Sequence, residues 1–193
     1  MFKELFSFLS FIFICSSCWS QKVLVNVFMQ DRATITTGDT IYHDLNKRLT
    51  WKDFKGIPDA KHFGGAVTAS GYAFDADIKI KGKIVYLNIG VYVFFNKYQS
   101  WKKANINSDY HLLHEQVHFD ITRLGAENFI KQLVNSKFTK ENYEKLLNSV
   151  FDECYNENAA WQQQYDKETS HSINKTEQLK WNYKIATELK KLQ

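Results

Sequence analysis

The spacing of apolar residues changes once along this chain, and that change limits the folds it can adopt. Before about residue 97 apolar side chains alternate with polar ones, whereas after about residue 107 they recur every three or four positions. Alternation is typical of strands, and the longer spacing is typical of amphipathic helices. The sequence therefore predicts an α+β fold with an N-terminal antiparallel β-sheet followed by a helical half. The strand pattern is clearest at Val23, Val25 and Val27, and the helical pattern at Leu113, Val117, Ile121 and Leu124.

Turn and capping residues indicate where these elements begin and end. Lys81-Gly82-Lys83 lies between two alternating runs and predicts a β-hairpin turn. Ser108 precedes the first helical run and suits the N-cap of a long helix. A second helix is expected to begin near Thr139 and to run toward Gln164, and Asn174 predicts the start of a third.

The first 20 residues have the layout of a signal peptide. A basic residue precedes an apolar run over residues 5–14, and small residues stand one and three positions before a cleavage point at Gln21. The run is shorter than the about 20 residues that span a bilayer. We therefore expect residues 1–20 to be a signal peptide and residues 21–193 to form one secreted or periplasmic domain without a stable transmembrane segment. Attachment of a lipid to a cysteine of the signal region is the alternative.

Composition adds two limits on the exported chain. After removal of the signal peptide Cys154 is the one remaining cysteine, so the fold cannot use an intramolecular disulfide and Cys154 is expected to be a buried thiol. The net charge of +4 is small and spread along the chain, which argues against a nucleic-acid partner.

Residues 114–118 read His-Glu-Gln-Val-His, the HExxH pattern, inside the most strongly helical segment. Residues four apart on a helix lie about 40° apart around its axis, so His114 and His118 can bind the same ion. In a chain with 6 histidines, the expected number of chance matches to this pattern is about 0.01. The pattern therefore predicts a zinc site in a zincin-like arrangement.

Glu115 lies on the neighbouring face of the same helix. From there its carboxylate can act as general base on a zinc-bound water that attacks a carbonyl group. The sequence thus predicts a zinc metallopeptidase that hydrolyses peptide or protein substrates. Two alternatives remain: a zinc-stabilised envelope protein that binds without turnover, and a zinc amidase that acts on cell-wall peptides.

A catalytic zinc ion needs a third protein ligand, and several residues are candidates. The best candidate is His171, because the polar segment of residues 165–171 is expected to be a loop that can turn back onto the metal. Glu153 and Glu157, one turn apart on the second helix, are rivals. The other histidines are weaker candidates, and Asp120 points almost opposite to the ligand face. These weaker histidines are His43, His62 and His111.

Two acids of the same polar segment, Asp166 and Glu168, allow two readings. Either one orients the second ring nitrogen of a histidine ligand, or both are solvated loop residues.

Several stretches of the chain together resemble a bacterial family of secreted zinc-dependent proteases that is catalogued as a domain of unknown function. The stretches are HEQVHFDI at 114–121, YDKETSH at 165–171, Gln178, Trp181 and Asn182, with weaker matches at 49–56 and 66–71. The resemblance implies secretion and HExxH metal chemistry, although the protease label of that family rests largely on the motif. The family usually has glycine after the histidine of the second stretch, where this chain has Ser172.

Overall fold

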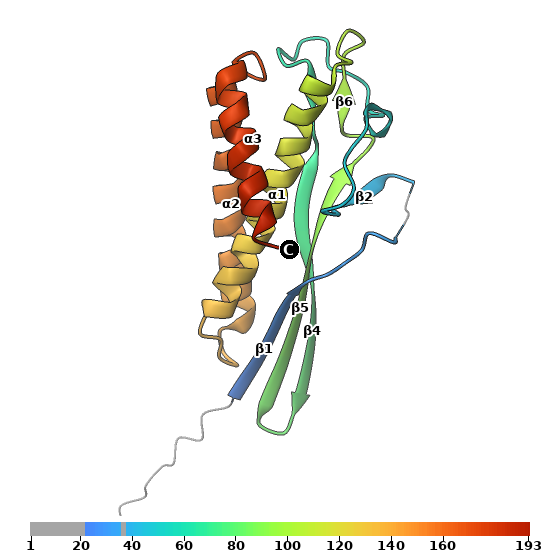
Figure 1. The fold of residues 1–193 in the computed structure, drawn as a ribbon. Coiled ribbons are helices and arrows are strands. Elements are labelled where there is room, and N and C mark those ends of the chain that lie inside the picture. Colours follow the sequence, from blue (N-terminus) through green and yellow to red (C-terminus); the bar gives the residue numbers. More distant parts are fainter. Residues whose placement is uncertain (1–21, 36–37) are drawn as a thin grey trace, which may run out of the picture.

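The computed structural model describes residues 22–35 and 38–193, so the predicted signal peptide lies outside the described residues. Strands come first and helices second, which confirms the α+β prediction (Figure 1). The strands are β1 (Lys22–Met29), β2 (Thr40–Tyr42), β3 (Ala66–Val67), β4 (Ser70–Lys81), β5 (Ile84–Asn96) and β6 (Trp101–Lys102). The helices are α1 (Asp109–Asn135), α2 (Tyr143–Thr169) and α3 (Lys175–Lys190), and Trp51–Asp53 forms a short 3-10 helix.

The main sheet is mixed, and the prediction of a purely antiparallel sheet was wrong. The central strand β5 pairs antiparallel with β4 along one edge. Along its other edge it pairs with β1 and then with β2, and the β1 pairing is parallel. The alternation of apolar residues in β1 specifies which face is buried but is the same for either strand direction, so it could not reveal the parallel pairing. Strands β3 and β6 form a separate antiparallel pair.

The predicted turn and cap residues are confirmed. Gly82 joins β4 to β5 with φ of +58°, a left-handed conformation that glycine adopts without steric cost. The Ser108 side chain accepts a hydrogen bond from the His111 backbone at the start of α1. The Asn174 side chain does the same for Glu177 at the start of α3.

Helix α1 lies between the sheet and the other two helices (Figure 1). Its apolar side chains meet the inward face of β5 in one core, and its other side packs with α2 and α3 around Tyr165 and Trp181. A helix enclosed in this way holds its polar side chains in fixed positions, as a binding site requires. The β5 residues of the core, each 0–3% exposed, are Val85, Leu87, Ile89, Val91, Val93 and Phe95.

Helix α2 lies later in the sequence than predicted, because it begins at Tyr143 and not near Thr139. It continues past Gln164 to Thr169, so the segment expected to be a loop is mostly the last turns of a helix. The chain then reverses through residues 170–172 into α3. On α2, Cys154 is a buried free thiol, as predicted. None of the helices among the described residues is both long enough and apolar enough to cross a membrane.

Candidate metal centre

The two histidines of the HExxH pattern project from α1 toward the same point. The Nε2 atoms of His114 and His118 lie 3.3 Å apart. Both rings pack against Tyr165 of α2, which is completely buried. The packing of Tyr165 therefore fixes both rings from one side.

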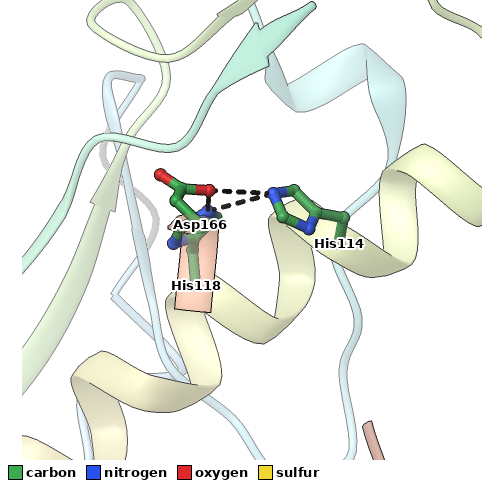
Figure 2. A group of neighbouring side chains, drawn as sticks. All are labelled: His114, His118 and Asp166. Carbon is green, nitrogen blue, oxygen red and sulfur yellow. Dashed lines mark hydrogen bonds and ion pairs between the residues drawn. The ribbon is translucent and has the colours of Figure 1, made fainter. Parts of the chain in front are cut away.

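Asp166 of α2 completes the group. Its Oδ1 atom lies 3.2 Å from His114 Nε2 and 3.1 Å from His118 Nε2. Figure 2 shows the three side chains converging, two from α1 and one from α2. Among the described residues, His114, His118 and Asp166 form a group that could hold a metal ion. One potential ligand atom from each side chain lies within 4.8 Å of the other two.

Two glutamines determine which nitrogen of each histidine carries the proton. His118 Nδ1 lies 2.6 Å from Gln162 Oε1, and His114 Nδ1 lies 2.7 Å from Gln178 Oε1. The amide orientations are fixed: Gln162 Nε2 donates to His118 O at 2.9 Å, and Gln178 Nε2 donates to the Tyr165 hydroxyl, which itself donates to His114 O. Each Nδ1 must therefore be the donor, which in the neutral ring leaves a lone pair on Nε2 facing the centre.

The centre of the group thus brings together three electron-pair donors and needs a positive charge. Burial opposes protonation of His118, but the hydrogen bond to Asp166 and the charges of Glu115 and Asp166 raise the pKa of His118 above its usual value. Burial opposes ionisation of Asp166, but its contacts with His114 and His118 hold the pKa of Asp166 well below its usual range. A shared proton or a bound cation satisfies the same three atoms.

The donor geometry fits a tetrahedral metal ion. Zinc binds nitrogen and oxygen ligands at about 2.0–2.2 Å, so neighbouring ligand atoms around a tetrahedral ion are separated by about 3.3–3.6 Å. The three measured separations, 3.1, 3.2 and 3.3 Å, agree with one face of such a tetrahedron to within about 0.5 Å. Two imidazoles and one carboxylate are also a usual ligand set for zinc. The residues present therefore fit a zinc ion.

Glu115 is buried beside this group and lines the same cavity. Its Oε2 atom accepts a hydrogen bond of 2.7 Å from Thr68 Oγ1, in the connection between β3 and β4. The same hydroxyl lies 3.1 Å from the Glu115 carbonyl oxygen. Thr68 therefore fixes the direction of the carboxylate from the sheet side of the cavity.

His171, the predicted third ligand, lies next to the group of three. Its Nδ1 atom is 3.2 Å from Asp166 Oδ1, and its ring packs edge-on against Phe63 at 4.4 Å between centroids. It is held there by a turn in which Ser170, His171 and Ser172 all have positive φ, between 47° and 71°. Non-glycine residues rarely adopt this conformation, and such strain collects at functional sites. Ser172 is the position at which the resembling family usually has glycine.

The rival carboxylates lie far from the histidines. On α2, Glu153 and Glu157 precede Asp166 by 13 and 9 residues, about 20 and 14 Å along the helix axis. Glu157 instead accepts a hydrogen bond from Asn128, and Glu153 is exposed. Glu168, the other acid of the polar segment, accepts a hydrogen bond from Trp181 Nε1 and joins α2 to α3.

The remaining histidines divide between the cavity and the far side of α1. His62 and His111 line the cavity, where His111 Nδ1 lies 2.6 Å from Ser108 Oγ. On the far side, Asp120 lies 3.1 Å from His43 Nε2 and also accepts a hydrogen bond from Arg48. Asp120 therefore has its own partners away from the metal ligands, as its angular position predicted.

Sequence reasoning did not single out the two glutamines or place Asp166 among the ligands. The sequence contains a signal that points to Asp166. If the predicted second helix is continued past Gln164, then Gln162 and Asp166 lie one turn apart on the same helix face. That face is the one that meets His118. Gln178 entered only as part of the family resemblance, because nothing local to it indicates a contact with α1.

Comparison with known proteins adds a partial family match. A family model described as a bacterial protein of unknown function, DUF922, matches residues 98–172. This segment contains the HExxH residues, Asp166 and His171. No curated protein and no solved structure matched the chain. The comparisons therefore connect the site residues to a bacterial family of unknown function, and the protease assignment stays a prediction.

Proposed function

We propose that this protein is a zinc-dependent peptidase that acts outside the cytoplasm after removal of residues 1–20. His114, His118 and Asp166 would hold the zinc, and Glu115 would be the general base. The observation that carries the proposal is the convergence of two imidazole lone pairs and one carboxylate oxygen on a single point, 3.1–3.3 Å from one another. Three electron-pair donors that face one another need a positive charge between them, and a bound metal ion would supply it.

Each residue of the site has a separate task in this proposal. A bound zinc ion acidifies water and polarises a carbonyl oxygen. Glu115, held by Thr68, accepts a proton from the attacking water and passes it to the leaving nitrogen of the peptide bond. Gln162 and Gln178 keep both histidines in the tautomer that presents Nε2.

The edge of β3 offers a place for the backbone of a peptide. Hydrogen-bonded and non-hydrogen-bonded residue pairs alternate along an antiparallel ladder. Because Lys103 N donates to Gly65 O at 2.8 Å, the next pair, Ala66 with Lys102, is a non-hydrogen-bonded one. The peptide groups of Ala66 therefore point away from β6, and Ala66 and Val67 line the cavity of the metal site. An extended peptide can bind such an edge as an added strand.

The test combines metal analysis with peptide hydrolysis. The purified protein is expected to contain one zinc ion per chain and to cleave peptides, with activity lost on chelation and restored by zinc. Glu115→Gln should keep the zinc and lose the activity, because glutamine can still accept the Thr68 hydrogen bond but cannot accept the proton. Glu153→Gln, an exposed acid on α2, is the matched control and should behave like the natural protein.

Two results would count against the proposal. Activity that survives in Glu115→Gln would show that Glu115 is not the general base. A zinc ion with four protein ligands would favour a binding protein without turnover. Digestion of cell-wall peptides in parallel, with products identified by mass spectrometry, separates an amidase from a peptidase.

A further inference from the structure

The cavity of the metal site continues into a second cavity. The first has a volume of about 220 Å³ and the second about 330 Å³. Val67, His118 and Asp166 line both, so the two meet at the candidate metal ligands. The second cavity runs between the start of β4 and the middle of α2, where Ser70 and Tyr155 lie on its opposite walls. The candidate zinc ligands therefore lie in the middle of a groove and not at its end.

The two halves of the groove differ in chemistry. The first half is apolar at its rim: Phe63 is 74% exposed although it packs against His171, and Ile106 lies nearby on the same cavity wall. The second half is lined by uncharged polar side chains, and apart from Asp166 its described lining residues include no Lys, Arg, Asp or Glu. These polar residues are Thr68, Ser70, Asn158, Gln162 and Gln163.

We infer that the substrate is an internal segment of a polypeptide that crosses the candidate metal site, which makes the protein an endopeptidase. An apolar side chain of the substrate would contact Phe63 on one side of the cleaved bond, and small or neutral polar side chains would lie along α2 on the other. Water adds across the peptide bond, so the products are a new C-terminal carboxylate and a new N-terminal amine. The inference rests on the proposed peptidase function and specifies its substrate.

The described residues that line the two ends of the groove include no Lys, Arg, Asp or Glu, which supports an internal segment over a chain terminus. An exopeptidase must recognise the charged amine or carboxylate of a terminus, usually with an opposite charge. In the part of the chain that the structure describes, neither cavity is lined by Lys or Arg, and the lining acids are Glu115 and Asp166, which already have roles at the centre. The edge of β3, by contrast, suits the uncharged backbone of an extended chain.

The first experiment compares peptides of one sequence with free and blocked ends. Internally quenched peptides with an apolar residue near the middle are offered either unmodified or with an acetylated N-terminus and an amidated C-terminus. We expect kcat/KM values that agree within about 2-fold and internal cleavage sites by mass spectrometry. Cleavage that requires a free end would overturn the inference but leave the proposed peptidase intact, whereas no metal-dependent cleavage of any peptide would overturn both.

The second experiment obstructs each half of the groove. Gln163→Trp fills the α2 half and should raise KM for long peptides by about 10-fold while zinc content stays at one per chain. Gln164→Trp changes the neighbouring exposed glutamine, which lines neither cavity, and should have no such effect.

The apolar half has its own matched pair. Phe63→Ala should reduce the preference for an apolar residue on one side of the cleaved bond by about 10-fold, whereas Ile57→Ala removes an apolar side chain that is 91% exposed outside the groove. If Gln163→Trp and Phe63→Ala leave both KM and the cleavage-site profile unchanged, the groove does not hold the substrate and the inference is wrong.

Discussion

The identity of the third ligand of the proposed zinc ion leads to the sharpest prediction, because the structure and the sequence pattern favour different residues. Asp166 Oδ1 lies 3.1 and 3.2 Å from the two histidine nitrogens, whereas His171 contacts the group through Asp166 alone. Asp166→Asn keeps the shape of the side chain and removes its charge. His171→Asn removes the ring and keeps a hydrogen-bond donor near the carboxylate.

The expected magnitudes follow from these different positions. Loss of a residue that orients a ligand typically weakens metal binding by about 10- to 100-fold, so loss of a ligand should exceed about 100-fold. At 1.36 kcal/mol per factor of ten, 100-fold corresponds to about 2.7 kcal/mol. At a fixed excess of zinc this energy is lost from the stabilisation that zinc provides. For a chain of 193 residues the zinc-induced rise in Tm should therefore shrink by about 5–10 °C in Asp166→Asn.

The assay is thermal unfolding of each variant with and without zinc, together with competition against a chelator of known affinity. The metal-free Tm of each variant is the reference, because Asp166 also contacts His118 directly and raises the pKa of that histidine. We expect His171→Asn to lose about 10-fold in zinc affinity, the lower end for an orienting residue, since its side chain is partly exposed. An equal or larger loss in His171→Asn than in Asp166→Asn would refute the assignment and make His171 the ligand.

Three further predictions concern the surroundings of the site. Gln178→Leu leaves the buried Nδ1–H of His114 without an acceptor, so unfolding free energy should fall by about 1–3 kcal/mol in chemical denaturation, while Gln164→Leu on the exposed face of α2 should cost little. Ser172→Gly relieves a φ of 71° and should raise Tm by about 2–4 °C, whereas Ser172→Ala keeps the strain and should give no such gain. Burial raises the pKa of the Cys154 thiol from 9.0 to about 11, so its thiolate fraction at about pH 8 should be about 100-fold below that of a free thiol; rapid alkylation of the native protein by iodoacetamide would contradict this.

The parts of the fold that the sequence revealed are those set by local chemistry. Gly82 turns a hairpin because of its own backbone freedom, and Ser108 and Asn174 cap helices through atoms a few residues away. The positions of His114 and His118 on one face of α1 likewise follow from their spacing of about one helical turn. Such features depend on neighbours in sequence, so the printed residues suffice to predict them.

The parts that the sequence did not reveal depend on contacts between distant segments. The direction of β1 is decided by its position beside β5, about 60 residues later, and either direction would bury the same side chains. Asp166 was interpreted either as a partner that orients a histidine ligand or as a solvated loop acid, because the polar residues after Gln164 suggested that the helix had ended. Tertiary contacts extend it instead: Tyr165 is buried under His114, and Thr169 is buried at its end. Propensity was overruled by packing, which is the usual reason for misplaced helix ends.

The same packing explains how two helices could hold one ion while a third orients one of the histidines. Tyr165 stacks on the His114 ring, donates a hydrogen bond to the His114 carbonyl at 3.3 Å and accepts one from Gln178. A single buried ring thus links α1, which carries the histidines, to α2, which carries Asp166, and to α3, which carries Gln178. These contacts are made between protein side chains, so they can hold the three candidate ligands in position for an ion. Replacement of Tyr165 by Phe would keep the ring but break both hydrogen bonds, so zinc affinity measured by chelator competition should fall by about 10-fold or more, yet by less than in Asp166→Asn.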